Sequence, residues 1–283
     1  MKPYTLNCNG RLVELSRPHV MGIVNVTPDS FYAASSQQSE DAVARRVRQI
    51  VGEGGTMIDV GAYSSRPGAA DVSVEEEMGR LRRALPIVRR EAPDAIVSVD
   101  TFRADVARMC VEEYGIDIVN DISGGTQDRR MFQTVARLGV PYVLMHIKGV
   151  PQTMQDAPTY DHFLQEVFLF LSERVERLHD LGVCDIILDP GFGFGKTLAN
   201  NYELMAHLAD FAEFDLPLLV GISRKSMIYR LLGGTADDAL NGTTALNTLA
   251  LAAGAHILRV HDVRAAVEAV RIVEAVRTEG KNI

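Results

Sequence analysis

Eight short apolar segments, each followed by a polar loop and an amphipathic helical segment, set the strongest constraint on the fold of this chain. Segments that are apolar along their whole length are typical of strands in a parallel sheet covered on both faces. Eight such units close a (β/α)8 barrel, and 283 residues is a usual length for that fold. The sequence therefore predicts an α/β protein with a TIM barrel, and an open doubly wound sheet is the alternative. The predicted strands are His19–Val24, Met57–Val60, Ala95–Val99, Asp117–Asn120, Pro141–Met145, Asp185–Leu188, Pro217–Gly221 and His256–Val260.

A β-hairpin is predicted ahead of the barrel, within residues 1–16. Asn9-Gly10 lies between Tyr4–Leu6 and Leu12–Leu15, and Asn-Gly between two alternating runs is a strong hairpin signal. The hairpin is expected to cover the end of the barrel opposite the active site. A helix near Asp238–Ala253 reads as an insertion between the last two strands. Because no linker or low-complexity tract separates these units, residues 1–283 are expected to form a single domain.

Composition excludes several classes of protein. The formal charge of −8 argues against general nucleic-acid binding, although it leaves room for a local basic pocket. No apolar run approaches the roughly 20 residues of a membrane span. Cys8, Cys110 and Cys184 are far apart and show no metal-like spacing, which is typical of reduced thiols in a cytoplasmic protein.

Polar side chains follow the carboxyl end of every predicted strand. Active sites of (β/α)8 barrels lie at that end, because the eight loops converge there. Contact with water explains one or two polar strand ends, whereas eight in succession, interleaved with glycines, indicate a ligand site. The residues are Asn25, Asp59 with Ser64-Ser65-Arg66, Asp100, Asn120-Asp121, His146 with Lys148, Asp189, Ser223-Arg224-Lys225, and Arg259 with His261.

These side chains are sorted chemically along the sequence. Asp100, Asn120 and Asp189 suit a flat heterocycle with an N–H edge, because a carboxylate accepts paired donors. Asn25, Arg259 and His261 come from the first and last strands, which adjoin in a closed barrel. They suit an anionic group such as phosphate, with or without a hard cation. The helix that begins near Lys225 is expected to hold a second anion, such as a carboxylate, at its free N–H groups.

The segment Pro190–Thr197 resembles a P-loop but does not satisfy its pattern. The first required glycine falls on Pro190, and the spacing of a dinucleotide-binding loop is also absent. We therefore reject a nucleotide-hydrolase or dinucleotide-binding function. Phe192 and Phe194 are expected to form walls of a substrate pocket, and core residues beneath the loop are the alternative.

With these residues in view, the chain resembles the dihydropteroate synthase family of bacterial pterin-binding enzymes. The resemblance extends from Met21 to Val263 and rests on several motifs in the order of the family. A single one of these motifs would be weak, but together they are highly specific. They are Met21–Phe31 (MGIVNVTPDSF), Asp59–Gly68 (DVGAYSSRPG), Ser98–Arg103 (SVDTFR), Asn120–Gly125 (NDISGG), Met145-His146, Asp189–Lys196 (DPGFGFGK), Gly221–Lys225 (GISRK) and Arg259–His261 (RVH).

The resemblance implies a transferase of folate biosynthesis. It would condense 6-hydroxymethyl-7,8-dihydropterin diphosphate with p-aminobenzoate, giving 7,8-dihydropteroate and diphosphate, and would be a target of sulfonamides. The family also implies a homodimer and Mg²⁺ as cofactor, bound through Asn25. Catalytic roles fall on Asp100, Lys225, Arg259 and His261. The implied pterin site is Asp100, Asn120, Met145, Asp189, Phe194, Gly221 and Lys225; the diphosphate site is Asn25, Ser65, Arg259 and His261; the p-aminobenzoate site is Phe31, Ser65, Arg66, Pro67, Phe192 and Ser223.

The implied mechanism is of the SN1 type, in which diphosphate departs before the amine attacks. We expect no nucleophilic triad and no covalent enzyme intermediate. The chain departs from the family in two loops: Tyr32–Gln37 replaces a common Ser-Asp-Gly-Gly, and Gly61–Arg66 (GAYSSR) replaces a common Gly-Gly-Glu-Ser-Thr-Arg. The alternative function is a pterin-binding methyltransferase module that presents methyltetrahydrofolate. Such a module would need neither the Asn25–Phe31 loop nor Arg259 and His261.

Overall fold

Eight parallel strands form a closed barrel in the computed structural model, which describes residues 2–26, 36–63, 72–149 and 158–279. The strands are hydrogen-bonded in the order β8-β7-β6-β5-β4-β3-β10-β9. A parallel bridge between Leu188 and Leu218 joins the two ends of this order, and the amide of Leu188 donates to Pro217 O at 2.9 Å. The predicted TIM barrel is therefore confirmed, and the alternative of an open sheet is wrong.

The barrel strands begin and end within one residue of their predicted positions, except for β9, which begins two residues later than predicted and contains only two residues. Their apolar residues alternate between the barrel interior and the surrounding helices, so the whole run is buried, as the sequence indicated. The strands are β3 (His19–Asn25), β4 (Met57–Gly61), β5 (Ile96–Asp100), β6 (Ile118–Asp121), β7 (Tyr142–Met145), β8 (Ile186–Asp189), β9 (Leu219–Val220) and β10 (Ile257–Val260).

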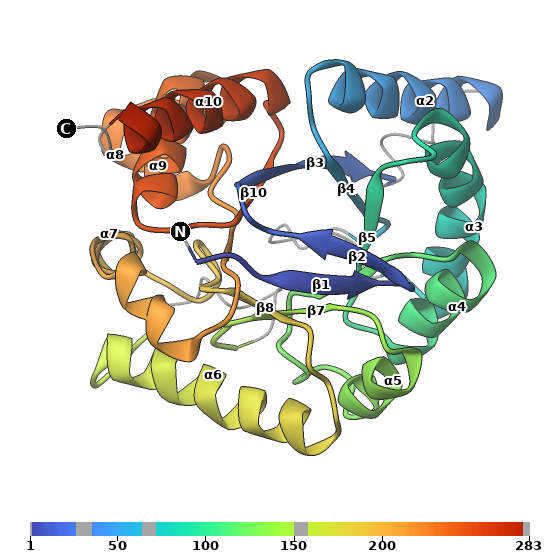
Figure 1. Ribbon diagram of the computed structural model, residues 1–283, viewed down its shortest axis with the longest axis horizontal. Coiled ribbons are helices and arrows are strands. Elements are labelled where there is room, and N and C mark those ends of the chain that lie inside the picture. The colour runs from blue at the N-terminus through green and yellow to red at the C-terminus, as the bar shows by residue number, and fades with distance from the viewer. Residues whose placement is uncertain (1, 27–35, 64–71, 150–157, 280–283) are drawn as a thin grey trace.

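Helices follow the strands and form the outer ring (Figure 1). The expected insertion between the last two strands is present as η2 and α9, which follow α8. Of the described residues, none belongs to a helix that is both long and apolar enough to cross a membrane. The helices are α2 (Ser36–Gly52), α3 (Val74–Glu91), α4 (Ala104–Tyr114), α5 (Met131–Leu138), α6 (Phe163–Asp180), α7 (Leu198–Ala206), η1 (Leu208–Phe214), α8 (Ser226–Leu232), η2 (Asp237–Ala239), α9 (Leu240–Ala252) and α10 (Val263–Glu279).

One apolar residue from each strand forms the lowest layer inside the barrel. These eight side chains share one hydrophobic cluster, separate from the larger core between the strands and the helices. Because side chains alternate along a strand, the positions two residues further on also face the axis. The polar side chains of the site occupy several of those positions. The lowest layer consists of Met21, Met57, Ile96, Ile118, Val143, Ile187, Leu219 and Ile257.

The N-terminal hairpin closes the barrel below this layer. Strands β1 (Thr5–Cys8) and β2 (Arg11–Glu14) are antiparallel, with Cys8 opposite Arg11. Asn9 and Gly10 both have positive φ, 52° and 85°, as a two-residue hairpin turn requires. Leu6, Cys8, Val13 and Leu15 pack against the lowest barrel layer, and Figure 1 shows β1 and β2 crossing that mouth. The expected position, opposite the polar strand ends, is confirmed.

Candidate active site

The second inward-facing layer of the barrel is where polar side chains replace apolar ones. Asp59 follows Met57 by two residues in β4, Asn120 follows Ile118 in β6, and Asp189 follows Ile187 in β8. Arg259 follows Ile257 in β10 in the same way. Asp59, Asn120 and Asp189 are all buried. Buried polar groups are costly unless they are paired, so their concentration in one layer indicates a ligand site.

Arg259 links the two groups of residues that the sequence analysis kept apart. Its Nε donates to Asp59 Oδ2 at 2.6 Å, and its Nη2 donates to Asp100 Oδ2 at 2.7 Å. Burial alone would lower the pKa of Arg259, but the two carboxylates outweigh it and raise that pKa. Burial raises the pKa of Asp100 to about 7, although Arg259 opposes the shift. Arg259 thus reaches past β3 to carboxylates on β4 and β5, instead of lying only beside Asn25.

Asn120 is oriented by the same aspartate. Its Nδ2 donates to Asp59 Oδ2 at 3.1 Å, in the barrel interior. The carbonyl oxygen Oδ1 of Asn120 is buried and has no hydrogen-bond partner among the described residues, and the same is true of Asp59 Oδ1. A buried acceptor without a partner is uncommon in folded proteins. The free carbonyl of Asn120 is therefore suited to an N–H donor of a ligand.

Asp189 and Lys225 form the opposite part of the polar layer. Burial raises the pKa of Asp189, which Lys225 and the amide of Gly191 at 2.8 Å oppose. Burial lowers the pKa of Lys225 to about 8, and Asp189 limits that shift. The Lys225 ammonium donates to Phe192 O and lies 4.5 Å from the centre of the Phe194 ring. The site thus has a buried carboxylate and a half-buried cation, and the cation lies over the Phe194 ring.

The apolar wall of the site is a third hydrophobic cluster, separate from the two cores. Met145 belongs to it with Ile122 and Ile147, and Phe102 and Phe194 pack against it. Gly221 lies beside Arg259, where an added Cβ would meet the Arg259 Cβ at 3.8 Å. A planar ring can therefore lie between this wall and the polar layer, and no bulky side chain at Gly221 obstructs it.

Ser223 and His261 meet at the ends of β9 and β10. The amide of His261 donates to Ser223 Oγ at 3.1 Å, and His261 Nδ1 lies 3.1 Å from the same oxygen. Burial and the neighbouring Arg259 lower the pKa of His261 to about 4. The imidazole is therefore neutral at pH 7 in the ligand-free protein and offers a hydrogen bond rather than a charge.

Arg224, between Ser223 and Lys225, has a structural role. Its φ is +56°, a left-handed conformation that side chains other than glycine rarely adopt. A two-pronged ion pair to Asp262, at 2.8 and 2.9 Å, fixes its side chain away from Lys225. The loop after β9 is thus tied to the loop after β10, and this tie sets the positions of Ser223 and Lys225.

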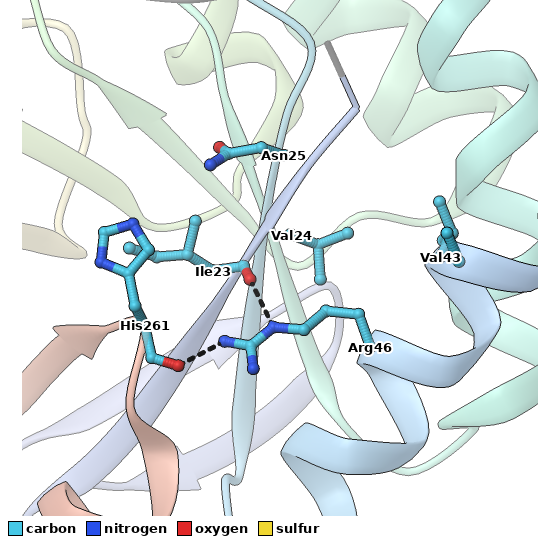
Figure 2. A pocket seen from close by; sticks show the side chains of 7 residues that line it. Ile23, Val24, Asn25, Val43, Arg46 and His261 are labelled. Carbon is cyan, nitrogen blue, oxygen red and sulfur yellow. Dashed lines mark hydrogen bonds between the residues drawn. The ribbon is translucent and has the colours of Figure 1, made fainter. Parts of the chain in front are cut away.

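A cavity of about 340 Å³ lies beside the end of β3. Figure 2 shows Asn25 and His261 at its edge, with the Arg46 guanidinium between two backbone segments. Arg46 Nε donates to Ile23 O at 3.1 Å, and Nη2 donates to His261 O at 2.6 Å. Arg46 thereby joins β3 to the end of β10 and keeps Asn25 and His261 on one side of the barrel. The cavity is lined by Ile23, Val24, Asn25, Ala42, Val43, Arg46 and His261.

Several polar residues at the strand ends point away from the site. Asp121 accepts from the amides of Ser123 and Gly125 and from the Tyr142 hydroxyl, so it organises its own loop. His146 is held by the buried Lys196, whose Nζ lies 2.8 Å from its Nδ1. Lys148 pairs with Glu166 at 2.8 Å. The expectation that every strand end contributes to the site was therefore too broad, because neighbouring residues on a strand face opposite sides.

Phe192 is placed differently from the pocket wall that the sequence indicated. Phe192 has no exposed surface and packs in the outer core, which favours the alternative given for it above. Its carbonyl, rather than its ring, reaches the site through Lys225. The predicted p-aminobenzoate contacts Phe31, Ser65, Arg66 and Pro67 lie outside the described residues.

Comparisons with known proteins agree on one family. Residues 21–261 match the family described as "Pterin binding enzyme". The dihydropteroate synthase of Escherichia coli strain K12 is 44% identical over 281 residues, which is 98% of each chain. A structure of Yersinia pestis dihydropteroate synthase with a sulfonamide drug is 42% identical, with a TM-score of 0.87, and the match covers 97% of this chain and 100% of that one.

A structure of Xanthomonas albilineans dihydropteroate synthase with 4-aminobenzoic acid has a TM-score of 0.88 and 40% identity, over 98% of this chain and 99% of that one. These similarities cover the barrel and every strand end at which the site residues lie. The chain therefore belongs to the family of pterin-binding enzymes and, within that family, to the dihydropteroate synthases.

Proposed function

We propose that this chain is the transferase that joins 6-hydroxymethyl-7,8-dihydropterin diphosphate to p-aminobenzoate, giving 7,8-dihydropteroate and diphosphate in folate biosynthesis. Membership of the dihydropteroate synthase family supports this reaction. The observation that carries it is the polar layer inside the barrel. There, the buried acceptors of Asn120 and Asp189 and the half-buried carboxylate of Asp100 lie with the cations of Lys225 and Arg259, beside an apolar wall.

The pterin ring fits this layer by its hydrogen-bonding pattern. Its N–H edge pairs with acceptors, which Asp189 and the free carbonyl of Asn120 provide. Lys225 donates to a ring acceptor, and Met145 and Phe194 pack against the ring face. Because burial raises the pKa of Asp189, hydrogen bonds from the ligand compensate for a carboxylate that is poorly solvated in the free protein.

The diphosphate is assigned to Arg259, His261 and Asn25, at the junction of β10 and β3. Arg259 supplies the charge, while the neutral His261 supplies a hydrogen bond and becomes easier to protonate as negative charge approaches. To bind diphosphate, the Arg259 guanidinium must give up part of its pairing with Asp100. Substrate binding thus releases the Asp100 carboxylate close to the reacting carbon.

Mg²⁺ fits this junction as a cation that arrives with diphosphate. Among the described residues, no group of three or more His, Cys, Asp or Glu side chains is arranged to hold a metal. Mg²⁺ is commonly held by one or two protein oxygens together with water and substrate phosphates, and the Asn25 amide oxygen is such a ligand. When bound there, Mg²⁺ would neutralise part of the charge on the departing diphosphate.

Diphosphate binding by the wild-type protein is predicted to require Mg²⁺ and to weaken in Arg259→Ala and in His261→Ala. Pterin without diphosphate should bind both variants with an affinity within about threefold of wild type, because its main partners are on other strands. Isothermal titration calorimetry with each ligand checks this. Equal losses for both ligands would show that the two parts of the site are not separable.

The reaction then follows from electrostatics. Departure of diphosphate leaves a cation on the pterin methylene group, which the ring delocalises and the freed Asp100 carboxylate stabilises. The amine of p-aminobenzoate is neutral at pH 7, so its lone pair attacks without a strong base. Carbon–oxygen cleavage precedes carbon–nitrogen bond formation, and the amine loses a proton after the attack. The chain's task is to hold the partners in place and to exclude water.

For p-aminobenzoate, the described residues offer Ser223 and the start of α8. Ser223 Oγ and the nearby amides suit a carboxylate, and the Xanthomonas relative was solved with 4-aminobenzoic acid. Sulfonamides carry a comparable aniline, and the Yersinia relative was solved with such a drug. We propose the same site for both compounds in this chain.

The alternative, a module that presents methyltetrahydrofolate, is disfavoured by one observation. Such a module needs pterin ligands but no anion site, whereas here Arg259, His261 and Asn25 converge at one strand junction.

A single domain formed by residues 1–283, a cytoplasmic location and a homodimer complete the proposal. The thiols of Cys8, Cys110 and Cys184, which are free, suit a reducing compartment.

The deciding experiment is an assay of diphosphate release by the purified protein. Release should require both pterin diphosphate and p-aminobenzoate, and mass spectrometry should detect dihydropteroate in equal amount. Release without p-aminobenzoate would indicate a hydrolase. Methyl transfer from methyltetrahydrofolate to a corrinoid, without diphosphate release, would support the alternative.

A further inference from the structure

We infer that Asp59 is the positioning residue of the active site: it orients Asn120 and Arg259 toward the substrate without touching the substrate itself. The inference rests on the proposed binding of pterin diphosphate. The reaction described above assigns no role to this carboxylate, although it lies at the centre of the polar layer. Its side chain has no exposed surface, and its Oδ2 already accepts hydrogen bonds from Asn120 and Arg259.

One oxygen of Asp59 holds two residues from different strands. Oδ2 accepts from Asn120 Nδ2 at 3.1 Å and from Arg259 Nε at 2.6 Å. Asn120 belongs to the proposed pterin site and Arg259 to the proposed diphosphate site. Asp59 is therefore the common support of both parts, and its place in β4, two residues after the buried Met57, fixes it in the rigid barrel.

The chemistry of a carboxylate decides how Asn120 is turned. An ionised carboxylate only accepts hydrogen bonds, so a side-chain amide beside it must turn its NH₂ group toward it. The Asn120 carbonyl then faces elsewhere, and it has no partner among the described residues although it is buried. Without Asp59 the amide could rotate by half a turn and present NH₂ to the N–H edge of the pterin, which would oppose binding.

Arg259 is held at its Nε side by the same oxygen. This leaves its two terminal nitrogens directed toward Asp100 and the end of the barrel, and Nη2 donates to Asp100 at 2.7 Å. A planar guanidinium fixed at Nε can exchange Asp100 for a diphosphate oxygen by a small movement. Loss of Asp59 should therefore disturb both ligands, whereas loss of Asn120 should disturb only the pterin.

The test compares Asp59→Asn with wild type in pterin affinity, in kcat and in KM for each substrate. The neutral amide no longer dictates the orientation of Asn120, so pterin affinity should fall by about tenfold or more. The KM for pterin diphosphate should rise with it, while the KM for p-aminobenzoate should stay within about twofold. Pterin affinity and kcat within about twofold of wild type, in a folded variant, would overturn the inference.

A double-mutant cycle with Asn120→Ala separates positioning from direct contact. If Asp59 acts on the pterin through Asn120, the double variant should bind pterin no more than about threefold worse than Asn120→Ala alone. Additive losses would mean that Asp59 contacts the pterin itself, and the inference would fail. If Asp59→Asn does not fold, Asp59→Ser enters the same cycle, since a hydroxyl also accepts without dictating the amide's orientation.

Asp117→Asn is the matched control, because Asp117 is also buried and also accepts from an arginine and from a second donor. It pairs with Arg89 at 3.0 Å and with the amide of Val97 at 2.8 Å, just before β6, at the end of the barrel away from the polar layer. Its variant should lose stability but keep pterin affinity. If the wild-type protein bound no pterin, the proposed function would fail. If the wild-type protein bound pterin and Asp59→Asn bound it equally well, only the inference about Asp59 would fail.

Discussion

At the scale of single residues, the free energy of ligand binding should depend most on the buried acceptors. Asp189→Asn replaces a carboxylate that pairs with a heterocycle by an amide that can also donate. We expect the protein to remain folded and pterin binding to weaken by about 2–4 kcal/mol, which corresponds to roughly 30- to 1,000-fold. Calorimetry with 6-hydroxymethyl-7,8-dihydropterin measures this loss. Unchanged binding would contradict the assignment of Asp189 to the pterin site.

Two half-buried ionisable residues, Asp100 and Lys225, should also give the enzyme a pH optimum between their two pKa values. Burial raises the pKa of Asp100 to about 7, so its carboxylate is lost as the pH falls through that value. Burial lowers the pKa of Lys225 to about 8, so its charge is lost as the pH rises through that value. The profile of kcat/KM for pterin diphosphate should therefore fall on both sides of neutral pH.

The matched controls are Asp100→Asn and Lys225→Arg. The asparagine cannot titrate, so its residual activity should show no acid limb, and the arginine stays charged, so its profile should show no alkaline limb near pH 8. If the acid or alkaline limb of the kcat/KM profile persisted unchanged in these variants, that limb would report the titration of a substrate or of another residue.

At the scale of elements, the N-terminal hairpin should stabilise the barrel without taking part in binding. Leu6 is 2% exposed and packs on the lowest barrel layer, whereas Leu12 on the other strand is 73% exposed. Leu6→Ala should lower the free energy of unfolding by about 2–5 kcal/mol, and Leu12→Ala by less than about 0.5 kcal/mol. Denaturant unfolding measures both. Altered pterin affinity in folded Leu6→Ala would show that the hairpin also influences the site.

Most of the elements could be predicted from the sequence because their signals are local. A fully apolar run such as Met57–Val60 identifies a strand buried on both faces, and Asn9-Gly10 needs only its own backbone preferences to form a turn. The convergence of polar strand ends followed from the number of strands. Closure of the barrel depends on a bridge between Leu188 and Leu218, and no local pattern indicates it.

The sequence predicts the directions of side chains less well than it predicts the strands and helices. Asn120 and Asp121 are adjacent, so alternation allows only one of them to face the barrel axis, and that signal was available. The reach of Arg259 to Asp59 was not predictable in this way. It depends on β10 and β4 lying two places apart in the closed barrel, with β3 between them, so that their inward-facing side chains meet in the interior. A long side chain crosses that distance only in the assembled fold.

At the scale of the whole molecule, the distribution of exposed apolar side chains supports the proposed homodimer. Among the described residues, eleven large hydrophobic side chains are exposed, and six of them lie on α8, α9 and α10. Figure 1 shows these three helices together on one side of the barrel. A stable interface buries about 800 Å² on each partner, which helices of this length can provide. The six residues are Leu231, Leu232, Leu240, Leu249, Ile272 and Val276.

Sedimentation velocity should therefore give twice the 31.0 kDa of one chain for the wild-type protein. Ile272, 62% exposed on α10, and Leu169, 60% exposed on α6, form a matched pair on different sides of the barrel. Ile272→Glu places a charge in the proposed interface and should shift the protein toward the monomer, because an unpaired charge is costly to bury. Leu169→Glu should leave the mass unchanged. A monomeric wild-type protein would contradict the proposed homodimer. A dimer that Leu169→Glu disrupts and Ile272→Glu does not would show that the interface lies elsewhere than on α8–α10.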